Sequence, residues 1–321
     1  MPSTATITRD TTLCVSLAAR PSNLRTRFHN FLYDELGLDF VYKTFAPADL
    51  EAAVAGIRGL GIPGAGVSMP FKEACIPLLD ELDPSAATID SVNTIVNDGG
   101  RLRGYNTDYL AVQQVLAAHE VPPRLEFAVL GNGGMAKAVV AALRDAGFTS
   151  GTVVAPRNLN RARSLAEQYG FDAAVGAPPR PARLLVNVTP IGMAGGPQEH
   201  DLSFARELVE QAEVVFDVVA FPPETPLVRL GRELGRTTLT GAEVIAVQAA
   251  EQFVLYTGVR PTPGPGPAGL GVLPRLSSRL QQRLPWWDGI ARCTAGRVAA
   301  TPQPLGPSLL LEARPRSAPG S

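Results

Sequence analysis

One lysine in the sequence has the properties of a residue that transfers protons. The chain contains 26 arginines but only three lysines, and Lys72 follows a short apolar run in the segment GAGVSMPFKE (64–73). Burial and nearby charges readily shift the pKa of a lysine, whereas an arginine stays protonated. A lysine beside a carboxylate can therefore serve as a general acid or base. The alternative is that Lys72 is an ordinary surface residue of a helix.

Other polar residues that could act with Lys72 lie near the ends of apolar runs. Ser68 precedes Lys72, Asn93 lies in SVNTIV, and Asp108 lies in GYNTD. Ligands of open α/β sheets bind beyond the carboxyl ends of the strands. We therefore expect these side chains to gather at such an edge, with Asp108 as the carboxylate partner of Lys72.

A glycine-rich segment, GNGGMA (131–136), has the spacing GxGxxA and lies between an apolar run and a helical pattern. Glycines allow a tight turn and a close approach to a pyrophosphate, which the N-terminus of the next helix attracts. We expect Gly131, Asn132, Gly133 and Gly134 to contact a dinucleotide. The alternative is a turn whose glycines only allow close packing of helix against sheet.

The next apolar run leads into a basic segment, VVAPRNLNRAR, without any acid. Enzymes that prefer NAD carry a carboxylate there, which binds the ribose 2′-hydroxyl. Arg157 and Arg161 are four residues apart, on one helical face, and guanidinium groups suit a 2′-phosphate. The segment predicts NADP as the cofactor, with Arg157, Asn158 and Arg161 beside it; a solvated basic turn is the alternative.

Apolar runs alternate with helical patterns over most of the chain, which is typical of an α/β fold. We expect strands at 13–17, 39–45, 64–69, in 127–147 before its helix, and at 152–158, 183–192, 214–219 and 237–241, with a hairpin over 91–108. We expect helices at 24–37, 48–60, 108–119 and 242–257, and a further helix that follows the strand at 152–158 and ends at about residue 169.

This order predicts two domains. An N-terminal α/β domain that binds substrate spans 1–106, and helix 242–258 returns to it. A C-terminal Rossmann-type, doubly wound domain that binds NADP spans 107–241.

The composition changes after Arg260. Residues 261–321 include 11 prolines and carry a net charge of +5 (7 − 2), against −6 (22 − 28) for residues 1–260. Proline at this density excludes helices and central strands. We expect a disordered or non-native tail, either a flexible basic extension or an off-frame product of GC-rich DNA. A chain that ends near Pro263 should fold and act like the whole.

Composition also argues against several kinds of partner. A net charge of −1 gives no reason to expect nucleic acid. No apolar run approaches the roughly 18 residues of a membrane helix, and the N-terminus does not have the pattern of a secretory signal. Cys14, Cys75 and Cys293 are widely spaced, which predicts a reducing cytoplasm and no metal site.

Six spaced segments together resemble the shikimate dehydrogenase family. They are GVSMPFKE, SVNTIV, GYNTD, GNGGMAKA, NVTPIG and GAEVIAVQAAEQF, which occur in the order of the family over about residues 11–260. The resemblance implies an N-terminal substrate domain and a C-terminal NADP domain. It also implies reversible hydride transfer between a nicotinamide and a ring carbon that bears a hydroxyl, on which Lys72 and Asp108 would act.

The resemblance implies roles for further residues. Ser68, Asn93 and Gln248 resemble ligands of the substrate hydroxyls, and Thr189 resembles a cofactor contact. Under one alignment, Ser22 corresponds to one of the two serines that hold the shikimate carboxylate in the family.

The sequence also departs from the family where the substrate is held. The second of these serines is absent, and Arg20, Arg25 and Arg27 lie in its segment. Gly66 replaces the usual asparagine, and Ala220 falls where a tyrosine is typical. The catalytic pair is thus intact while the contacts to substrate differ. This pattern resembles the shikimate dehydrogenase-like branch, whose members oxidise shikimate poorly; the arginines could still hold a carboxylate.

The expected function is therefore reversible, NADP-dependent reduction of 3-dehydroshikimate or a related cyclic hydroxy acid, within aromatic amino acid biosynthesis. The expected ligand is a small molecule, and a homodimer is one option for the assembly. One alternative is the same chemistry on quinate or another polyhydroxylated ring acid. A second is a non-catalytic NADP-binding regulator. A tetrahydrofolate-type dehydrogenase fits the architecture but not the order of the motifs.

Overall fold

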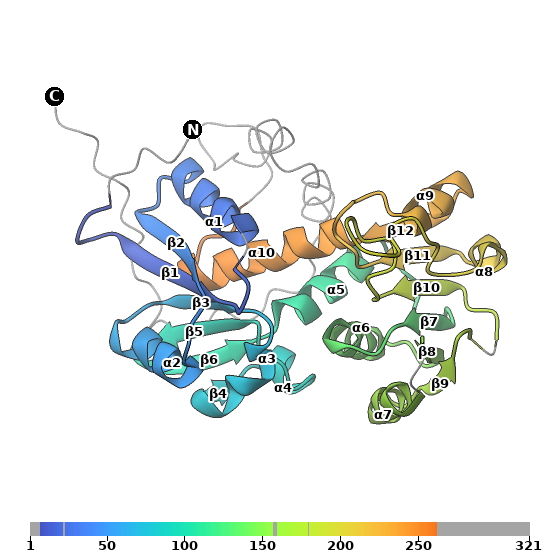
Figure 1. Cartoon of the computed structure of the whole chain (residues 1–321), viewed down its shortest axis with the longest axis horizontal. Coiled ribbons are helices and arrows are strands. Elements are labelled where there is room, and N and C mark those ends of the chain that lie inside the picture. The colour runs from blue at the N-terminus through green and yellow to red at the C-terminus, as the bar shows by residue number, and fades with distance from the viewer. Residues whose placement is uncertain (1–6, 22, 157–158, 179, 262–321) are drawn as a thin grey trace. The chain divides into compact units, whose positions relative to one another are not determined.

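The computed structural model describes residues 7–261 except 22, 157, 158 and 179. Apart from Pro261, the tail predicted at 261–321 lies outside the described residues. The described chain divides into two compact units, one formed by residues 7–107 and 249–261 and the other by residues 108–248. The division falls within the last helix, between Gln248 and Ala249. Figure 1 labels the elements of both units.

The first unit contains a six-stranded mixed sheet with the order β2-β1-β3-β5-β6-β4. Its strands are β1 (Thr12–Leu17), β2 (Phe40–Phe45), β3 (Gly64–Val67), β4 (Glu81–Leu82), β5 (Thr94–Asp98) and β6 (Arg101–Tyr105). Strands β1, β2 and β3 are parallel, as expected for strands joined through helices. Strand β5 is antiparallel to both β3 and β6. The hairpin turn between β5 and β6 consists of Gly99 and Gly100, both with positive φ, as its NDGG sequence predicts.

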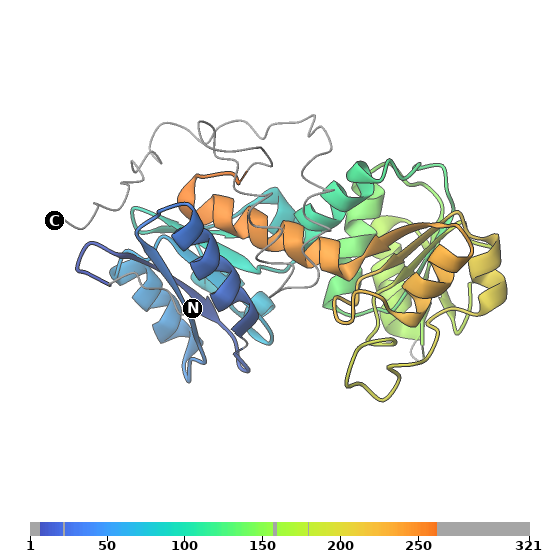
Figure 2. The ribbon, with the colours of Figure 1, turned by 90° about the horizontal axis from the view of Figure 1, so that it is seen from above.

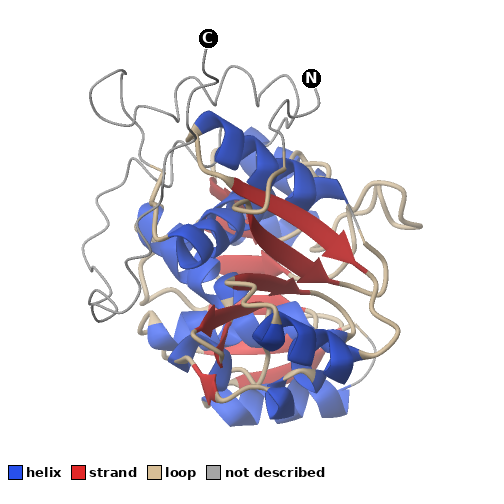
Figure 3. Ribbon diagram, turned by 90° about the vertical axis from the view of Figure 1, so that its left-hand side faces the viewer, coloured by secondary structure: helices blue, strands red, loops and turns tan. Residues whose placement is uncertain are grey.

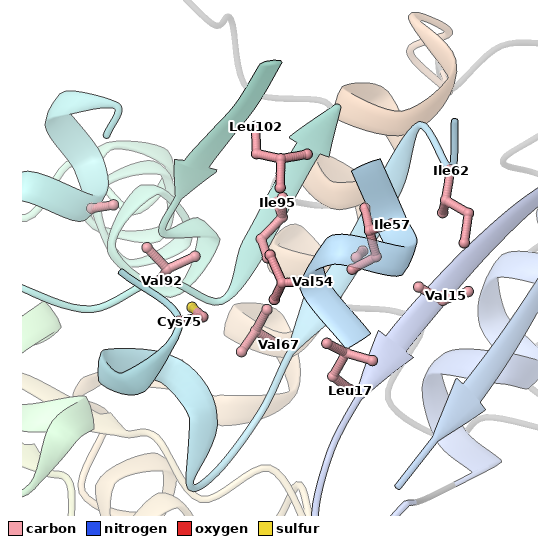
Figure 4. Packing of buried hydrophobic residues seen from close by; sticks show 12 residues of the cluster. Val15, Leu17, Val54, Ile57, Ile62, Val67, Cys75, Val92, Ile95 and Leu102 are labelled. Atoms are coloured by element: carbon pink, nitrogen blue, oxygen red, sulfur yellow. The ribbon is translucent and has the colours of Figure 1, made fainter. Parts of the chain in front are cut away.

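Helices cover both faces of this sheet (Figure 3). They are α1 (Asn23–Glu35), α2 (Leu50–Gly59), the short α3 (Phe71–Ala74) and α4 (Pro84–Ala87), a 3-10 turn (Ile76–Leu78), and the later part of α10 (Gly241–Thr257). Helix α2 begins after Asp49, whose side chain accepts a hydrogen bond from the Ala52 amide. Its buried face packs on the strands through Val54 and Ile57 (Figure 4). Helices α1 and α10 lie side by side over the opposite face (Figure 2), where His29 contacts Phe253.

The second unit is a doubly wound α/β fold. Its strands are β7 (Phe127–Leu130), β8 (Gly151–Ala155), β9 (Asp172–Val175), β10 (Leu184–Asn187), β11 (Val214–Asp217) and β12 (Thr237–Thr240), and all are parallel. Their order is β12-β11-β10-β7-β8-β9. Its helices are α5 (Thr107–Ala118), α6 (Gly134–Asp145), α7 (Leu159–Tyr169), α8 (Arg206–Gln211), α9 (Pro226–Glu233) and the start of α10. The strand order reverses between β7 and β10, where such sheets bind ligands.

The predicted fold class is confirmed, with corrections to individual elements. Four predicted strands end at least two residues earlier than expected, since those at 64–69, 152–158, 183–192 and 214–219 end at Val67, Ala155, Asn187 and Asp217. The described residues beyond them form loops that carry the polar groups of the site. Elements β4, β9, α3, α4, α8 and α9 were not expected from the sequence. In the described part of the chain, no helix is long and apolar enough to cross a membrane.

A capping box starts α10. The Thr240 hydroxyl accepts a hydrogen bond from the Glu243 amide at 3.3 Å, and the Glu243 carboxylate accepts one from the Thr240 amide at 2.8 Å. The other carboxylate oxygen lies 3.0 Å from Nε2 of His119. Burial alone would raise the pKa of Glu243, but its contacts with His119 and Thr240 outweigh this effect and lower the pKa below its ordinary value.

We expect Glu243 to stabilise the chain in a pH-dependent way. Because its pKa is lower in the folded state, its contribution is present above the pKa of an unfolded glutamate, near 4.5, and is lost as the pH falls through the folded value. Glu243→Gln should cost about 1 kcal/mol at pH 7, because it weakens charge-assisted hydrogen bonds, and it should flatten the dependence of the unfolding free energy on pH below about 4.5. Urea unfolding followed by circular dichroism measures both effects.

The exposed Glu233 provides the control, because it lies 3.8 Å from Arg206 in a surface pair. Glu233→Gln should leave the unfolding midpoint unchanged. A Glu243→Gln variant that unfolds like the wild type at every pH would contradict this role.

Candidate active site

Backbone hydrogen bonds hold the segment that carries Ser68 and Lys72. Beyond the end of β3, the Ser68 amide donates to the Leu17 carbonyl at 2.9 Å, and the Phe71 amide donates to the Ser68 carbonyl at 2.9 Å. Lys72 lies in α3, and its carbonyl accepts from the Val92 amide at 2.9 Å. Ser68 and Lys72 are half-buried. Both positions are therefore fixed by main-chain contacts.

Asn93 is adjacent to this segment, because its carbonyl accepts a hydrogen bond from the Val67 amide at 2.7 Å. Its side chain is fully buried. Oδ1 accepts from the Thr94 hydroxyl at 2.8 Å and from the amide and hydroxyl of Thr107 at 2.8 and 3.1 Å. Nδ2 has no hydrogen-bond partner among the described residues. The structure thus brings Ser68, Lys72 and Asn93 to one edge of the first unit and leaves Asn93 a donor for a ligand.

The remaining predicted catalytic and substrate residues belong to the second unit or fall outside the described residues. Asp108 follows Thr107 in the first turn of α5, is half-buried, and begins the second unit. Gln248 is buried in α10 and also belongs to the second unit. Ser22 lies outside the described residues. Lys72 and Asp108 are therefore parts of different units.

The glycine-rich turn after β7 fits a dinucleotide. Gly131 has a φ of +123°, and a Cβ there would lie 2.7 Å from a methyl group of Val188, so no other residue suits this position. Gly133 and Gly134 are exposed at the N-terminus of α6, and a Cβ on either would meet nothing within 4 Å. Ala136 is fully buried, so α6 packs closely on the sheet. The turn leaves room for a pyrophosphate at the N-terminus of a 12-residue helix.

The residues predicted to select NADP lie beyond β8, which ends at Ala155. Arg157 and Asn158 lie outside the described residues. Arg161 is exposed in the first turn of α7. The sequence between Ala155 and Arg161 contains no acid.

Thr189 belongs to a buried polar network at the carboxyl ends of β10 and β11. Its amide and hydroxyl donate to Oδ1 of Asn187 at 3.0 and 2.6 Å. Nδ2 of Asn187 donates to Asp217 at 3.0 Å, and Asp217 accepts from the Thr225 hydroxyl at 2.7 Å. Burial raises the pKa of Asp217 to about 6, although its hydrogen bonds, including one from the Val219 amide, oppose this shift. The network fixes the two loops that follow these strands.

Sequence reasoning missed Thr107, Asn187, Asp217 and Thr225. All four are fully buried polar residues near strand ends, and they orient predicted site residues. The signal available in the sequence was a polar residue directly after an apolar run, as in LLVNVT and VVFDVV.

One pocket of the second unit lies apart from this site. A polar pocket of about 450 Å³ includes Val214 and Thr237, the first residues of β11 and β12. It is therefore at the amino edge of the sheet, opposite Thr189.

Within the described ranges, no three histidine, cysteine, aspartate or glutamate residues are arranged to hold a metal ion.

Comparison with known proteins agrees with this arrangement. Residues 23–95 match the model of the shikimate dehydrogenase substrate binding domain. The chain is 51% identical to a shikimate dehydrogenase-like protein of Haemophilus influenzae over 80% of this chain and 94% of that protein. It also resembles a solved shikimate 5-dehydrogenase from Thermus thermophilus in complex with NADP(H) and shikimate. The identity is 33%, the coverage is 78% of this chain and 95% of the other, and the TM-score is 0.68.

A third similar protein is a quinate dehydrogenase from Corynebacterium glutamicum in complex with NAD. Its structure is 29% identical, covers 78% of this chain and 95% of its own, and has a TM-score of 0.70. These matches span both units and nearly the full length of each relative. The chain therefore belongs to the shikimate dehydrogenase family, in its shikimate dehydrogenase-like branch.

Proposed function

We propose that the chain is an NADP-dependent oxidoreductase that reversibly reduces 3-dehydroshikimate or a related cyclic hydroxy acid. The observation that carries this proposal is the edge of the first unit that brings together Ser68, Lys72 and Asn93, where Lys72 is half-buried and Nδ2 of Asn93 has no partner among the described residues. The glycine-rich turn of the second unit fits the dinucleotide. Relatives of this fold that carry NADP(H) and shikimate support the same chemistry.

In the proposed reaction, Lys72 handles the proton of the reacting hydroxyl. During oxidation the O–H proton passes to Lys72, while the hydrogen on the same carbon leaves as hydride; NADP, when bound, accepts that hydride. Asp108 supports the charge changes of the lysine. Nδ2 of Asn93 and the hydroxyl of Ser68 hold other oxygens of the ring. A lysine suits this task because its ammonium can lose and regain a proton, whereas a guanidinium cannot.

Gly131, Asn132, Gly133 and Gly134 would hold the pyrophosphate of the cofactor. Arg157, Asn158 and Arg161 would bind the 2′-phosphate, and Thr189 would contact the cofactor near the switch point of the sheet. Thr189 already donates its hydroxyl proton to Asn187, so its oxygen would accept a hydrogen bond. Gln248 and Ser22 complete the proposed substrate ligands.

The second candidate function is the same chemistry on quinate or another polyhydroxylated ring acid. It is favoured by Gly66, because a Cβ at this position would lie 2.8 Å from the Tyr42 hydroxyl and 3.2 Å from the Ser16 hydroxyl. Internal hydroxyls therefore take the space where an asparagine side chain would begin. A related quinate dehydrogenase has the same fold.

The proposed setting is a reducing cytoplasm, which agrees with the free, buried thiols of Cys14 and Cys75. A homodimer remains a proposal, and light scattering of the purified protein tests it.

Removing the Lys72 amine should lower kcat by about 100-fold or more, because general acid–base catalysis contributes about 10²–10⁴-fold. Lys72→Arg should fail as well, since the charge alone does not transfer the proton. Initial rates at saturating NADP measure both. The control is Lys43→Ala, which removes an exposed amine that lies 5.3 Å from the Phe45 ring centre. Equal turnover by wild type and Lys72→Ala on every substrate would instead indicate a non-catalytic NADP-binding regulator.

Arg157→Ala and Arg161→Ala should each raise the KM for NADPH about 10-fold or more and change the KM for NADH less than two-fold. The reason is that a charge-assisted hydrogen bond contributes about 1.5–3 kcal/mol and only NADPH carries the 2′-phosphate. Arg163→Ala, an exposed arginine on the same helix, provides the control. Equal changes for both cofactors would refute the assignment.

The substrate is tested by comparing shikimate, quinate and aminated analogues at saturating NADP. We expect kcat/KM for shikimate to be below that for at least one other ring acid, because the contacts around Gly66 differ from those of the family. Shikimate as the best substrate of the panel would overturn this expectation and leave the reaction type in place.

A further inference from the structure

Gln252 makes a buried contact with the candidate site from α10. Its side chain is fully buried, and Nε2 donates to the Asn93 carbonyl at 3.2 Å and to the Thr94 hydroxyl at 2.9 Å. All three residues belong to the first unit. The sequence separation of about 158 residues explains why no local pattern reveals this contact.

The hydrogen bonds that link Gln252, Thr94 and Asn93 run in one direction. The Thr94 hydroxyl has a single proton, which it donates to Oδ1 of Asn93 at 2.8 Å. It must therefore accept from Gln252. The Asn93 carbonyl can only accept as well. A reversed Gln252 amide would set its oxygen against two acceptors, so the orientation of this amide is fixed.

The other end of Gln252 faces a rigid aromatic cluster. Burial, together with the charge of Arg25, lowers the pKa of the neighbouring His29 imidazole to about 3, and Gln252 opposes this shift. The imidazole is therefore neutral and can donate one N–H. Its ring stacks on Tyr42 at 4.4 Å and on Phe253 at 6.3 Å between ring centres. No hydrogen bond joins the side chains of His29 and Gln252, because Oε1 of Gln252 and both ring nitrogens have no partner among the described residues. The hydrogen bonds of Nε2 therefore set the orientation of the Gln252 amide.

We propose that Gln252 is a positioning residue for substrate binding: through the Thr94 hydroxyl it keeps the Asn93 side-chain oxygen turned inward and its Nδ2 turned to the substrate. This inference rests on the proposed function, in which Asn93 is a substrate ligand. Without Gln252, the Thr94 hydroxyl is free to turn to another acceptor. Oδ1 of Asn93 then keeps only its contacts with Thr107, so the side chain loses one of its three internal donors and is held less firmly in the orientation that presents Nδ2 to the substrate.

The kinetic test uses Gln252→Leu and Thr94→Val in the full chain. Each should raise the substrate KM about 10-fold, with kcat and the KM for NADP within two-fold of wild type. Thr94→Ser, which keeps the hydroxyl, should restore the wild-type KM. Because the two residues act in series, the double variant should be no worse than Thr94→Val alone.

The control is Asn97→Leu, since Asn97 is another buried amide of β5 that contacts Ile57 and Gly100 instead. It should lower the melting temperature without changing the substrate KM. An equal rise in KM for Asn97→Leu and Gln252→Leu would assign Gln252 a merely structural role and overturn the proposal. Additive effects in the double variant would do the same.

A measurement without turnover separates this proposal from the proposed function. In a ¹⁵N NMR spectrum, the side-chain NH₂ signals of Asn93 are identified by their loss in Asn93→Asp. We expect one sharp pair in the wild type, and a split or broadened pair in Gln252→Leu and Thr94→Val. Unchanged signals in both variants would overturn the positioning role. Should the wild type oxidise no ring acid, the proposed function fails while the NMR result still decides the orientation of Asn93.

Discussion

The candidate site depends on buried amide oxygens that are fully occupied by internal donors. Asn93 in the first unit directly precedes β5, and Asn187 in the second is the last residue of β10. The side-chain oxygen of each asparagine accepts hydrogen bonds from both the backbone amide and the hydroxyl of one threonine. These contacts fix Thr107 and Thr189 and so fix the loops around them. A buried amide whose oxygen is occupied can face a ligand only with its NH₂ group. In Asn93 that group has no other partner among the described residues.

The NH₂ groups of Asn93 and Asn187 differ in what they contact. In the second unit, Nδ2 of Asn187 donates inward to Asp217, so the whole side chain supports the loops that follow β10 and β11. Burial raises the pKa of Asp217, although its hydrogen bonds with Thr225, Val219 and Asn187 oppose this shift. In the first unit the corresponding donor, Nδ2 of Asn93, has no partner among the described residues. Asparagines whose oxygens are bonded in a similar way thus have a paired NH₂ group in the second unit and one without a described partner in the first.

The sequence alone predicted the features that depend on residues close together in the chain. The spacing GNGGMA predicted the turn at Gly131, and the polar residues after apolar runs predicted the edge that holds Ser68, Lys72 and Asn93. It did not reveal Gln252 or Thr107, because their partners are set by tertiary packing. It also missed β9, a partly exposed edge strand with little hydrophobic pattern, and α9, which begins at the Thr225 cap.

Main-chain bonding explains how a change at position 66 can coexist with an unchanged position for Lys72, the proposed catalytic lysine. Ser68 is held through its amide and carbonyl and Lys72 through its carbonyl, and these contacts do not depend on the side chain at position 66. Replacing an asparagine there by Gly66 lets the Tyr42 and Ser16 hydroxyls come close to the strand and leaves the path of the backbone intact. The side chains that touch the substrate can therefore vary while the proton donor stays in place. When the main chain positions the reacting lysine in this way, the reaction can stay the same within a family while the ring that is oxidised differs.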